Sequence, residues 1–273
     1  MTPERQLQPA RVMLGRVSVS RFILGGNPFG GYSHQSPERS KDMVDWYTME
    51  RVKEAYRKAE AAGVTTHLGR ADHFIMRALN EHWNEGGALT WICQTCPGVG
   101  PIEMGVRNAV AGKARACFIH GGEMDFRVAH GETQEIRDGI KMIKDHGMAA
   151  GVAGHSTATI RWALDHLDVD FFMTCYYNPD DRTRSAAKTG EEEQYLAEDR
   201  DAMAALIQQL PKPAIHYKVL AAGRHNPADG FAYVADVYRP GDAVCVGIFT
   251  KDDPDMVQKD VDLLETALRA RGK

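Results

Sequence analysis

The sequence predicts a (β/α)8 barrel, in which eight parallel strands alternate with helices. Eight short runs are almost continuously apolar instead of alternating, which is typical of parallel strands covered on both faces. Amphipathic segments separate the runs, and 273 residues is an ordinary length for a single barrel. The runs are Arg21–Gly26, Gly63–Leu68, Ala88–Gln94, Ala116–His120, Met148–His155, Asp170–Asn178, Pro213–Leu220 and Ala243–Phe249.

Helical patterns lie between these runs, at Met49–Gly63, Thr133–Gly147, Glu198–Leu210 and Asp253–Ala270. Each repeats apolar residues every three or four positions. Ahead of the first run, residues 11–21 are predicted to form a hairpin that closes the bottom of the barrel. No segment has the composition of a linker, so residues 1–273 are predicted to form a single domain.

The composition excludes several classes of protein. A net charge of −4 opposes nucleic-acid binding, and no apolar run approaches the roughly 20 residues of a membrane span. The N-terminal residues have no apolar core of a secretory signal, and five cysteines do not suggest a disulfide framework. We therefore expect a cytoplasmic enzyme with a small-molecule substrate and leave its oligomeric state open.

Three histidines, His67, His120 and His155, each close a predicted strand. Barrel active sites lie at these carboxyl ends, and three imidazoles with one open position describe a catalytic metal site. One hypothesis is that they bind a divalent metal (Zn, Mn, Co or Fe), and the other is that each is a hydrogen-bonded core residue. In the adjoining loops, four residues could be further metal ligands or could hydrogen-bond to the ligands and orient them: Asp72, His73, Glu123 and Asp125.

The leading hypothesis for function is metal-assisted proton abstraction from a small polyhydroxylated or keto, sugar-like substrate. The reaction would be a lyase, isomerase or hydrolase step. His120 would act in catalysis, and Lys218 or His216 would move the proton. If Tyr217 faces the mouth, strand alternation turns both neighbours away unless the strand bulges. Substrate-binding candidates are Asn27, Gln94, Tyr177, Asn178 and Arg224.

A polar loop at Pro179–Gln194 follows the sixth predicted strand. Loops of this length in compact domains are usually functional or mobile. The sequence leaves open whether the loop is a lid or a solvated insertion.

Several segments resemble those of aldo-keto reductases: VMLGRVSVSRFILGGNPFGG, GVAGHSTATI, DVDFFMTCYYNPDDR, IHYKVLAAGR and VGIFTKDDPDMVQKDVDLL. The resemblance runs from about Arg11 to Leu264. It implies a barrel with an N-terminal hairpin and an NAD(P) cofactor. It also implies that Tyr217 stacks on the nicotinamide and that His120 is the histidine of the catalytic tetrad. A subgroup of uncharacterised proteins of this kind is similar at FIHGG, AGVAGH and CYYNP.

The sequence departs from the family at the rest of the tetrad. Gln94 replaces the lysine, and THLGRADHF stands where the aspartate and tyrosine are expected. Ala153 and Gly154 replace the pair that binds the carboxamide, and TKDDPD puts acids where the family binds the 2′-phosphate of NADP. The leading hypothesis therefore omits the nicotinamide. The alternatives are an NAD(P)-dependent oxidoreductase with an altered proton relay, preferring NAD, and a non-catalytic binding barrel.

Overall fold

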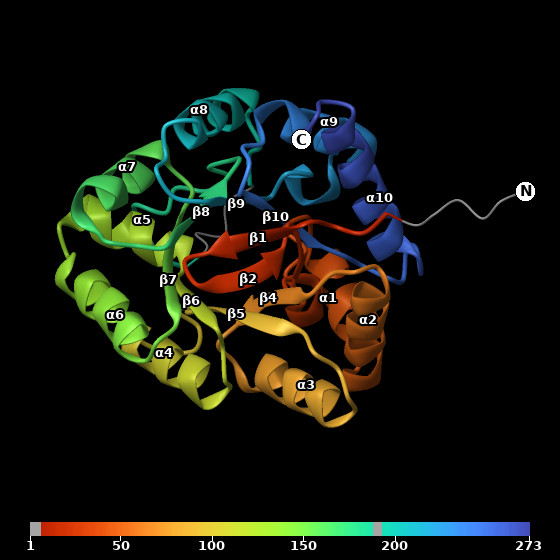
Figure 1. The fold of residues 1–273 in the computed structure, drawn as a ribbon. Helices are drawn as coiled ribbons and strands as arrows, with labels where there is room; N and C mark the ends of the chain where they lie inside the picture. The colour runs from red at the N-terminus through yellow and green to blue at the C-terminus, as the bar shows by residue number, and fades with distance from the viewer. Residues whose placement is uncertain (1–6, 188–192) are drawn as a thin grey trace, which may run out of the picture.

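The structure, a computed structural model, describes residues 7–187 and 193–273. Eight parallel strands close into a barrel in the order β10-β3-β4-β5-β6-β7-β8-β9, and helices surround it (Figure 1). This confirms the predicted (β/α)8 barrel. The strands are β3 (Phe22–Gly25), β4 (Thr66–Arg70), β5 (Thr90–Gln94), β6 (Ala116–Ile119), β7 (Ala149–Gly154), β8 (Phe171–Cys175), β9 (Ala214–Tyr217) and β10 (Ala243–Gly247).

The N-terminal hairpin also forms as predicted. It pairs β1 (Arg11–Leu14) with β2 (Val17–Ser20) in antiparallel register and lies across the barrel in Figure 1. Its apolar side chains pack with residues of the barrel interior in one buried cluster that includes Leu14, Val19 and Ile92. The hairpin thereby covers the end of the barrel opposite the carboxyl ends of the strands.

The helices occupy the segments between the strands, and the four predicted ones appear as α2, α6, α8 and α10. Side chains of Ser36, Thr48, Asp72 and Ser156 cap the starts of four helices by accepting a backbone N–H. The helices are α1 (Pro37–Trp46), α2 (Met49–Ala61), α3 (His73–Asn84), α4 (Ile102–Ala111), α5 (Gly121–His130), α6 (Gln134–Asp145), α7 (Thr157–His166), α8 (Ala197–Ile207), α9 (Pro227–Val237) and α10 (Met256–Arg269), with short 3-10 turns η1 (Pro28–Gly30) and η2 (Ala221–Gly223).

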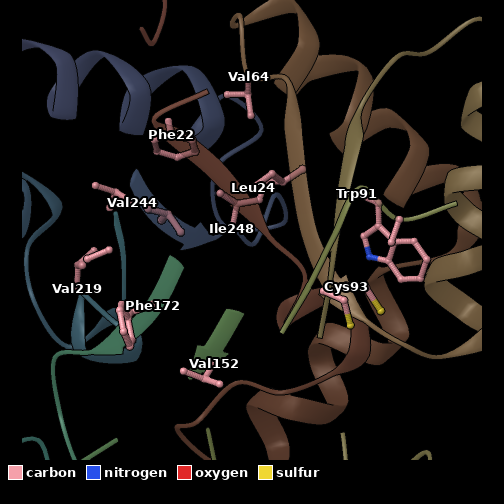
Figure 2. Packing of buried hydrophobic residues seen from close by; sticks show 14 of the residues in the cluster. Phe22, Leu24, Val64, Trp91, Cys93, Val152, Phe172, Val219, Val244 and Ile248 are labelled. Atoms are coloured by element: carbon pink, nitrogen blue, oxygen red, sulfur yellow. The ribbon is translucent and has the colours of Figure 1, made fainter. Parts of the chain in front are cut away.

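Two apolar layers follow from the alternation of side chains along each strand. The outer layer lies between strands and helices and includes Phe22, Leu24, Trp91 and Phe172 (Figure 2). The inner layer fills the barrel and includes Ile23, Leu68, Ile92, Phe118 and Met173. This alternation decides which polar residues at the strand ends reach the mouth.

No helix within residues 7–187 and 193–273 is long and apolar enough to cross a membrane. The five cysteines are free and buried.

Candidate functional site

A cavity of about 380 Å³ opens at the carboxyl ends of β3, β9 and β10. Its inner end lies in the barrel mouth, where Gln94, Phe118 and Tyr217 line it. Its outer end is lined by Phe249 and by residues that include Asp260 of α10. The cavity therefore leads from the centre of the barrel to the outer helix layer.

The loop after η1 and the loop after β9 are joined along the cavity. The Gln35 side-chain amide donates to the Ala222 carbonyl at 2.6 Å, and the Arg224 guanidinium donates to the His34 carbonyl at 2.9 Å. His34 Nδ1 lies 2.8 Å from Glu193 Oε1. Arg224 is absent from the cavity lining, so its described contacts hold loops together instead of facing the cavity.

Lys218 reaches the cavity because the backbone changes direction there. Its φ of 57° is left-handed, an uncommon conformation for a residue with a Cβ, and β9 ends at the preceding residue, Tyr217. The ammonium nitrogen lies 3.4 Å from His34 Nδ1 and 3.8 Å from Glu193 Oε2. Lys218 and Tyr217 thus both line the cavity, which simple strand alternation would not allow.

His155 and Asp125 form a buried pair beside Tyr217. His155 Nδ1 lies 2.7 Å from Asp125 Oδ2, and the His155 backbone N–H donates to the same oxygen at 3.1 Å. The ring packs edge-on to Tyr217, with centroids 6.1 Å apart. Burial lowers the pKa of His155, although the Asp125 hydrogen bond opposes the shift. The neutral ring donates from Nδ1 to the carboxylate, which leaves Nε2 as a proton acceptor.

His120 follows β6 in the same register as the inner residues Ala116 and Phe118. Its backbone N–H donates to Thr95 Oγ1 at 3.1 Å. Burial lowers its pKa to about 3, and the nearby charges of His155, Arg182, Arg70 and Lys218 add to the shift. Nδ1 is buried and has no hydrogen-bond partner in the described part of the chain. His120 is therefore a neutral imidazole with an unused nitrogen.

The structure corrects the prediction for His67. Its neighbour Leu68 faces the interior, so the His67 ring points outward and packs against Phe29 and Tyr56. His67 Nδ1 donates to the Leu24 carbonyl at 3.1 Å, and burial lowers its pKa to about 3. The three histidines do not converge. Among the residues placed by the structure, no group of three His, Cys, Asp or Glu side chains is arranged to hold a metal ion, so the predicted set of His67, His120 and His155 is not brought together.

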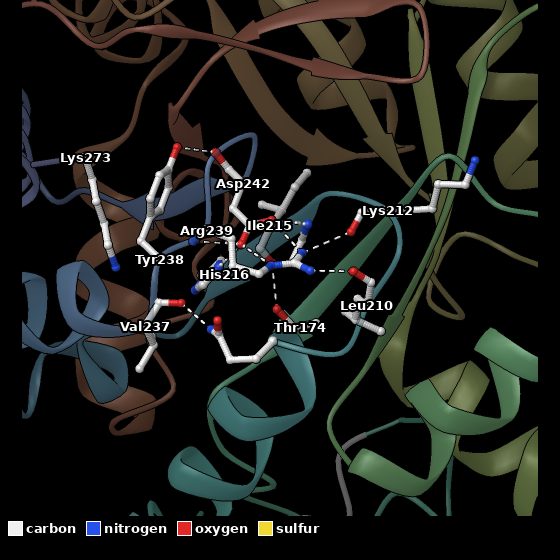
Figure 3. A network of polar contacts seen from close by, with 12 residues as sticks. Thr174, Leu210, Lys212, Ile215, His216, Val237, Tyr238, Arg239, Asp242 and Lys273 are labelled. Atoms are coloured by element: carbon white, nitrogen blue, oxygen red, sulfur yellow. Dashed lines mark hydrogen bonds and ion pairs between the residues drawn. The ribbon is translucent and has the colours of Figure 1, made fainter.

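His216 also lies outside the mouth, because Tyr217 takes the inward position. The ring is fully buried, with Nδ1 2.8 Å from the Tyr176 hydroxyl. Its Nε2 lies 3.2 Å from Asp242 Oδ2 (Figure 3). Arg239 donates to both oxygens of the same carboxylate, at 3.0 and 2.8 Å. His216 belongs to this network and does not line the cavity, so the structure does not support its predicted role in moving a proton.

The predicted substrate-binding residues divide into two groups. Asn27 and Gln94 line the cavity. Tyr177 is buried with its hydroxyl 2.9 Å from His225 Nε2, and exposed Asn178 donates its backbone N–H to Asp199. Tyr177 and Asn178, like Arg224, are not in the cavity lining.

Sequence reasoning did not select Arg70 or Arg182, whose charges act on His120. Arg70 was detectable, because it lies two residues beyond the inward Leu68 on β4. Arg182 comes from an irregular segment after β8 and had no periodic pattern to identify it. Part of the predicted loop at 179–194, residues 188–192, lies outside the described residues.

No protein-family model matches the chain, and no curated protein matches it. Two solved structures of provisionally assigned aldo-keto reductases from Pseudomonas aeruginosa share the fold. One has a TM-score of 0.65 at 16% identity and covers 97% of this chain and 98% of its own. The other has a TM-score of 0.63 at 17% identity and covers 96% of this chain and 95% of its own. At these identities the likeness shows that the chain shares the (β/α)8 fold of these two structures.

Proposed function

We propose that this barrel is an oxidoreductase that uses NAD(H) and interconverts a small alcohol and its carbonyl compound. The observation that carries the proposal is the cavity between Tyr217 in the barrel mouth and Asp260 on α10. A metal-assisted lyase, isomerase or hydrolase step has less support, because it relied on three histidines that do not meet.

The residues of the cavity fit a dinucleotide. Its volume of about 380 Å³ is within the range of small-molecule and cofactor sites. Tyr217 presents an aromatic side chain at the inner end, where the family resemblance places the nicotinamide. Gly25, Gly26 and Gly247 line the cavity without side chains, so a ligand could approach the backbone closely. When bound, the nicotinamide would supply the hydride acceptor or donor.

Acidic groups at the outer end favour NAD over NADP. Asp252 and Asp260 both line the cavity there, and a carboxylate repels a 2′-phosphate. Asp252 is paired with Arg39, whose guanidinium lies over the Phe249 ring at 4.4 Å. Asp260 is only 4% exposed, and burial, with the charge of Asp253, raises its pKa to about 7.

The His155–Asp125 pair supplies a proton relay in place of the family's tyrosine and lysine. In alcohol oxidation, neutral His155 Nε2 accepts the hydroxyl proton, and Asp125 stabilises the imidazolium that forms. In the reverse direction the imidazolium returns that proton to the carbonyl oxygen. Gln94, which lines the inner end, offers an amide N–H that can donate to the same oxygen.

The first test is turnover with either dinucleotide. The chain is incubated with NAD⁺ or NADP⁺ and a panel of small alcohols, and formation of the reduced nicotinamide is followed by absorbance. We expect turnover with NAD⁺ and kcat/KM at least tenfold lower with NADP⁺. Product formation without any nucleotide that is lost on metal chelation would contradict the proposal and restore the metal-assisted alternative.

The Asp260→Asn variant tests the origin of the preference. Because the carboxyl ionises through a pKa of about 7, NADPH binding to the parent chain should weaken from pH 6 to pH 8. In Asp260→Asn that pH dependence should be lost and NADPH affinity should rise, while NADH affinity changes less. Asp255→Asn, at the exposed residue that precedes α10, is the control. Equal pH dependence in parent and variant would exclude Asp260 as the discriminating group.

A further inference from the structure

Arg182 is a buried arginine whose Nε has no hydrogen-bond acceptor among residues 7–187 and 193–273. The residue is 5% exposed and lies in the segment between β8 and α8. Its contact within the described residues is an ion pair from Nε to Asp180 Oδ2 at 3.4 Å, and Nε makes no hydrogen bond there. Leaving a charged N–H donor such as this Nε without an acceptor in a buried place costs free energy, and the guanidinium carries four further N–H donors on its terminal nitrogens.

Arg182 lies at the inner end of the candidate site. The Ala186 carbonyl, four residues after Arg182, and His120 both lie against Gly122 at the start of α5, and the adjacent Gly121 lies against His155 and the Tyr217 hydroxyl. The positive charge of Arg182 acts on the same three side chains. His120 contributes a second buried polar atom, Nδ1, that has no partner among the residues the structure describes. Two such groups, from different loops of the barrel mouth, indicate that an acceptor brought by a ligand belongs between them.

We propose that the substrate carries a small oxyanion, a carboxylate or phosphate group, and that Arg182 binds it in the barrel mouth. The planar fork of a guanidinium matches two oxygens of either group, and His120 can add a further hydrogen bond. A neutral polyol would offer no charge to the buried guanidinium. Resting on the proposed function, the anion would hold a hydroxyl or carbonyl carbon of the same molecule next to His155.

Nearby acids do not satisfy Arg182. Asp125 accepts from His155, and Glu193 lies against His34 and Lys218. The ion pair of Asp180 Oδ2 with Arg182 Nε, at 3.4 Å, is not a hydrogen bond. The terminal nitrogens of Arg182 donate no hydrogen bond to the residues that the structure places. Both nitrogens can therefore donate to a ligand.

The inference is tested by calorimetric titration of the nucleotide-free chain with acetate, malonate, inorganic phosphate and glycerol. We expect binding of carboxylates or of phosphate, and none of glycerol. The better anion identifies the group on the substrate. Arg182→Gln should weaken the binding at least tenfold, and Arg182→Lys should recover part of it. Arg184→Gln, an exposed arginine in the same segment, should leave it unchanged.

The inference is overturned if no anion binds, or if Arg182→Gln binds anions as tightly as the parent chain. Thermal melting of each variant shows whether it is folded. If Arg182→Gln is not folded, the anion affinity of Arg182→Lys decides the test. Because the titration contains no dinucleotide, it can succeed where NAD(H) binding fails. The two proposals can therefore be rejected separately.

Discussion

Replacing His155 with asparagine is expected to lower kcat for alcohol oxidation by about 10²–10⁴-fold, the usual contribution of a general base. The affinity for NADH should stay within about twofold of the parent value, because His155 packs against Tyr217 at the inner end, where the substrate would lie, and is remote from Asp252 and Asp260 at the outer end. Asp125→Asn should also lower kcat, since the pair would lose the carboxylate that fixes the imidazole tautomer and stabilises its charged form. Steady-state kinetics with saturating NAD⁺ gives both values.

His73→Ala is the matched control for the His155 variant. His73 is the first residue of α3 and is exposed. From the sequence it is also a possible further ligand of the predicted metal site or a partner of its ligands. Its removal should leave kcat unchanged. If His155→Asn were as active as His73→Ala, the proton would have to move through another group, and the proposed relay would be abandoned.

A second large effect is expected at the network around His216. Asp242→Ala should lower the free energy of unfolding by about 3–5 kcal/mol, because it leaves the buried His216 and the partly buried Arg239 without their common acceptor. Asp138→Ala, at an exposed aspartate, should change it by less than about 0.5 kcal/mol. Urea unfolding measures both values. NADH affinity should be unaffected, whereas a large loss of NADH affinity in folded Asp242→Ala would contradict a purely structural role.

The same network gives a pH dependence of stability with a defined sign. Burial raises the pKa of Asp242, but hydrogen bonds from His216 and Arg239 outweigh it, and the net pKa is lowered. The stabilisation is therefore present above the unfolded-state pKa of about 3.9 and is lost as the pH falls through the lower folded-state value. The free energy of unfolding of the parent chain should therefore fall as the pH is lowered, and this fall should be smaller in Asp242→Ala.

The barrel and hairpin could be predicted because their determinants are local. Each strand is a short apolar run, and the amphipathic pattern of α6, with Ile136, Ile140 and Ile143 buried on one face, is visible in the sequence. The direction of each side chain at a strand end was harder to predict. A shift of one residue exchanges the two faces of a strand, which is why His67 was placed in the mouth and Leu68 was not.

The remaining site residues depend on features that a sequence does not display. The left-handed φ at Lys218 is carried by a residue that rarely adopts it, so nothing in the pattern showed that the chain turns there. Asp125 comes from α5 and meets His155 only through the packing of the barrel. Arg182 could be recognised as a candidate binding residue only from its burial and from the lack of an acceptor for its Nε among the described residues.

The central claim, that the cavity binds a dinucleotide, is tested most directly by calorimetric titration of the purified chain with NADH and with NADPH. The measurement should be accompanied by metal analysis of the same sample. We predict one NADH per chain, at least tenfold tighter binding than NADPH, and no stoichiometric metal. One metal ion per chain without binding of either nucleotide would contradict the account.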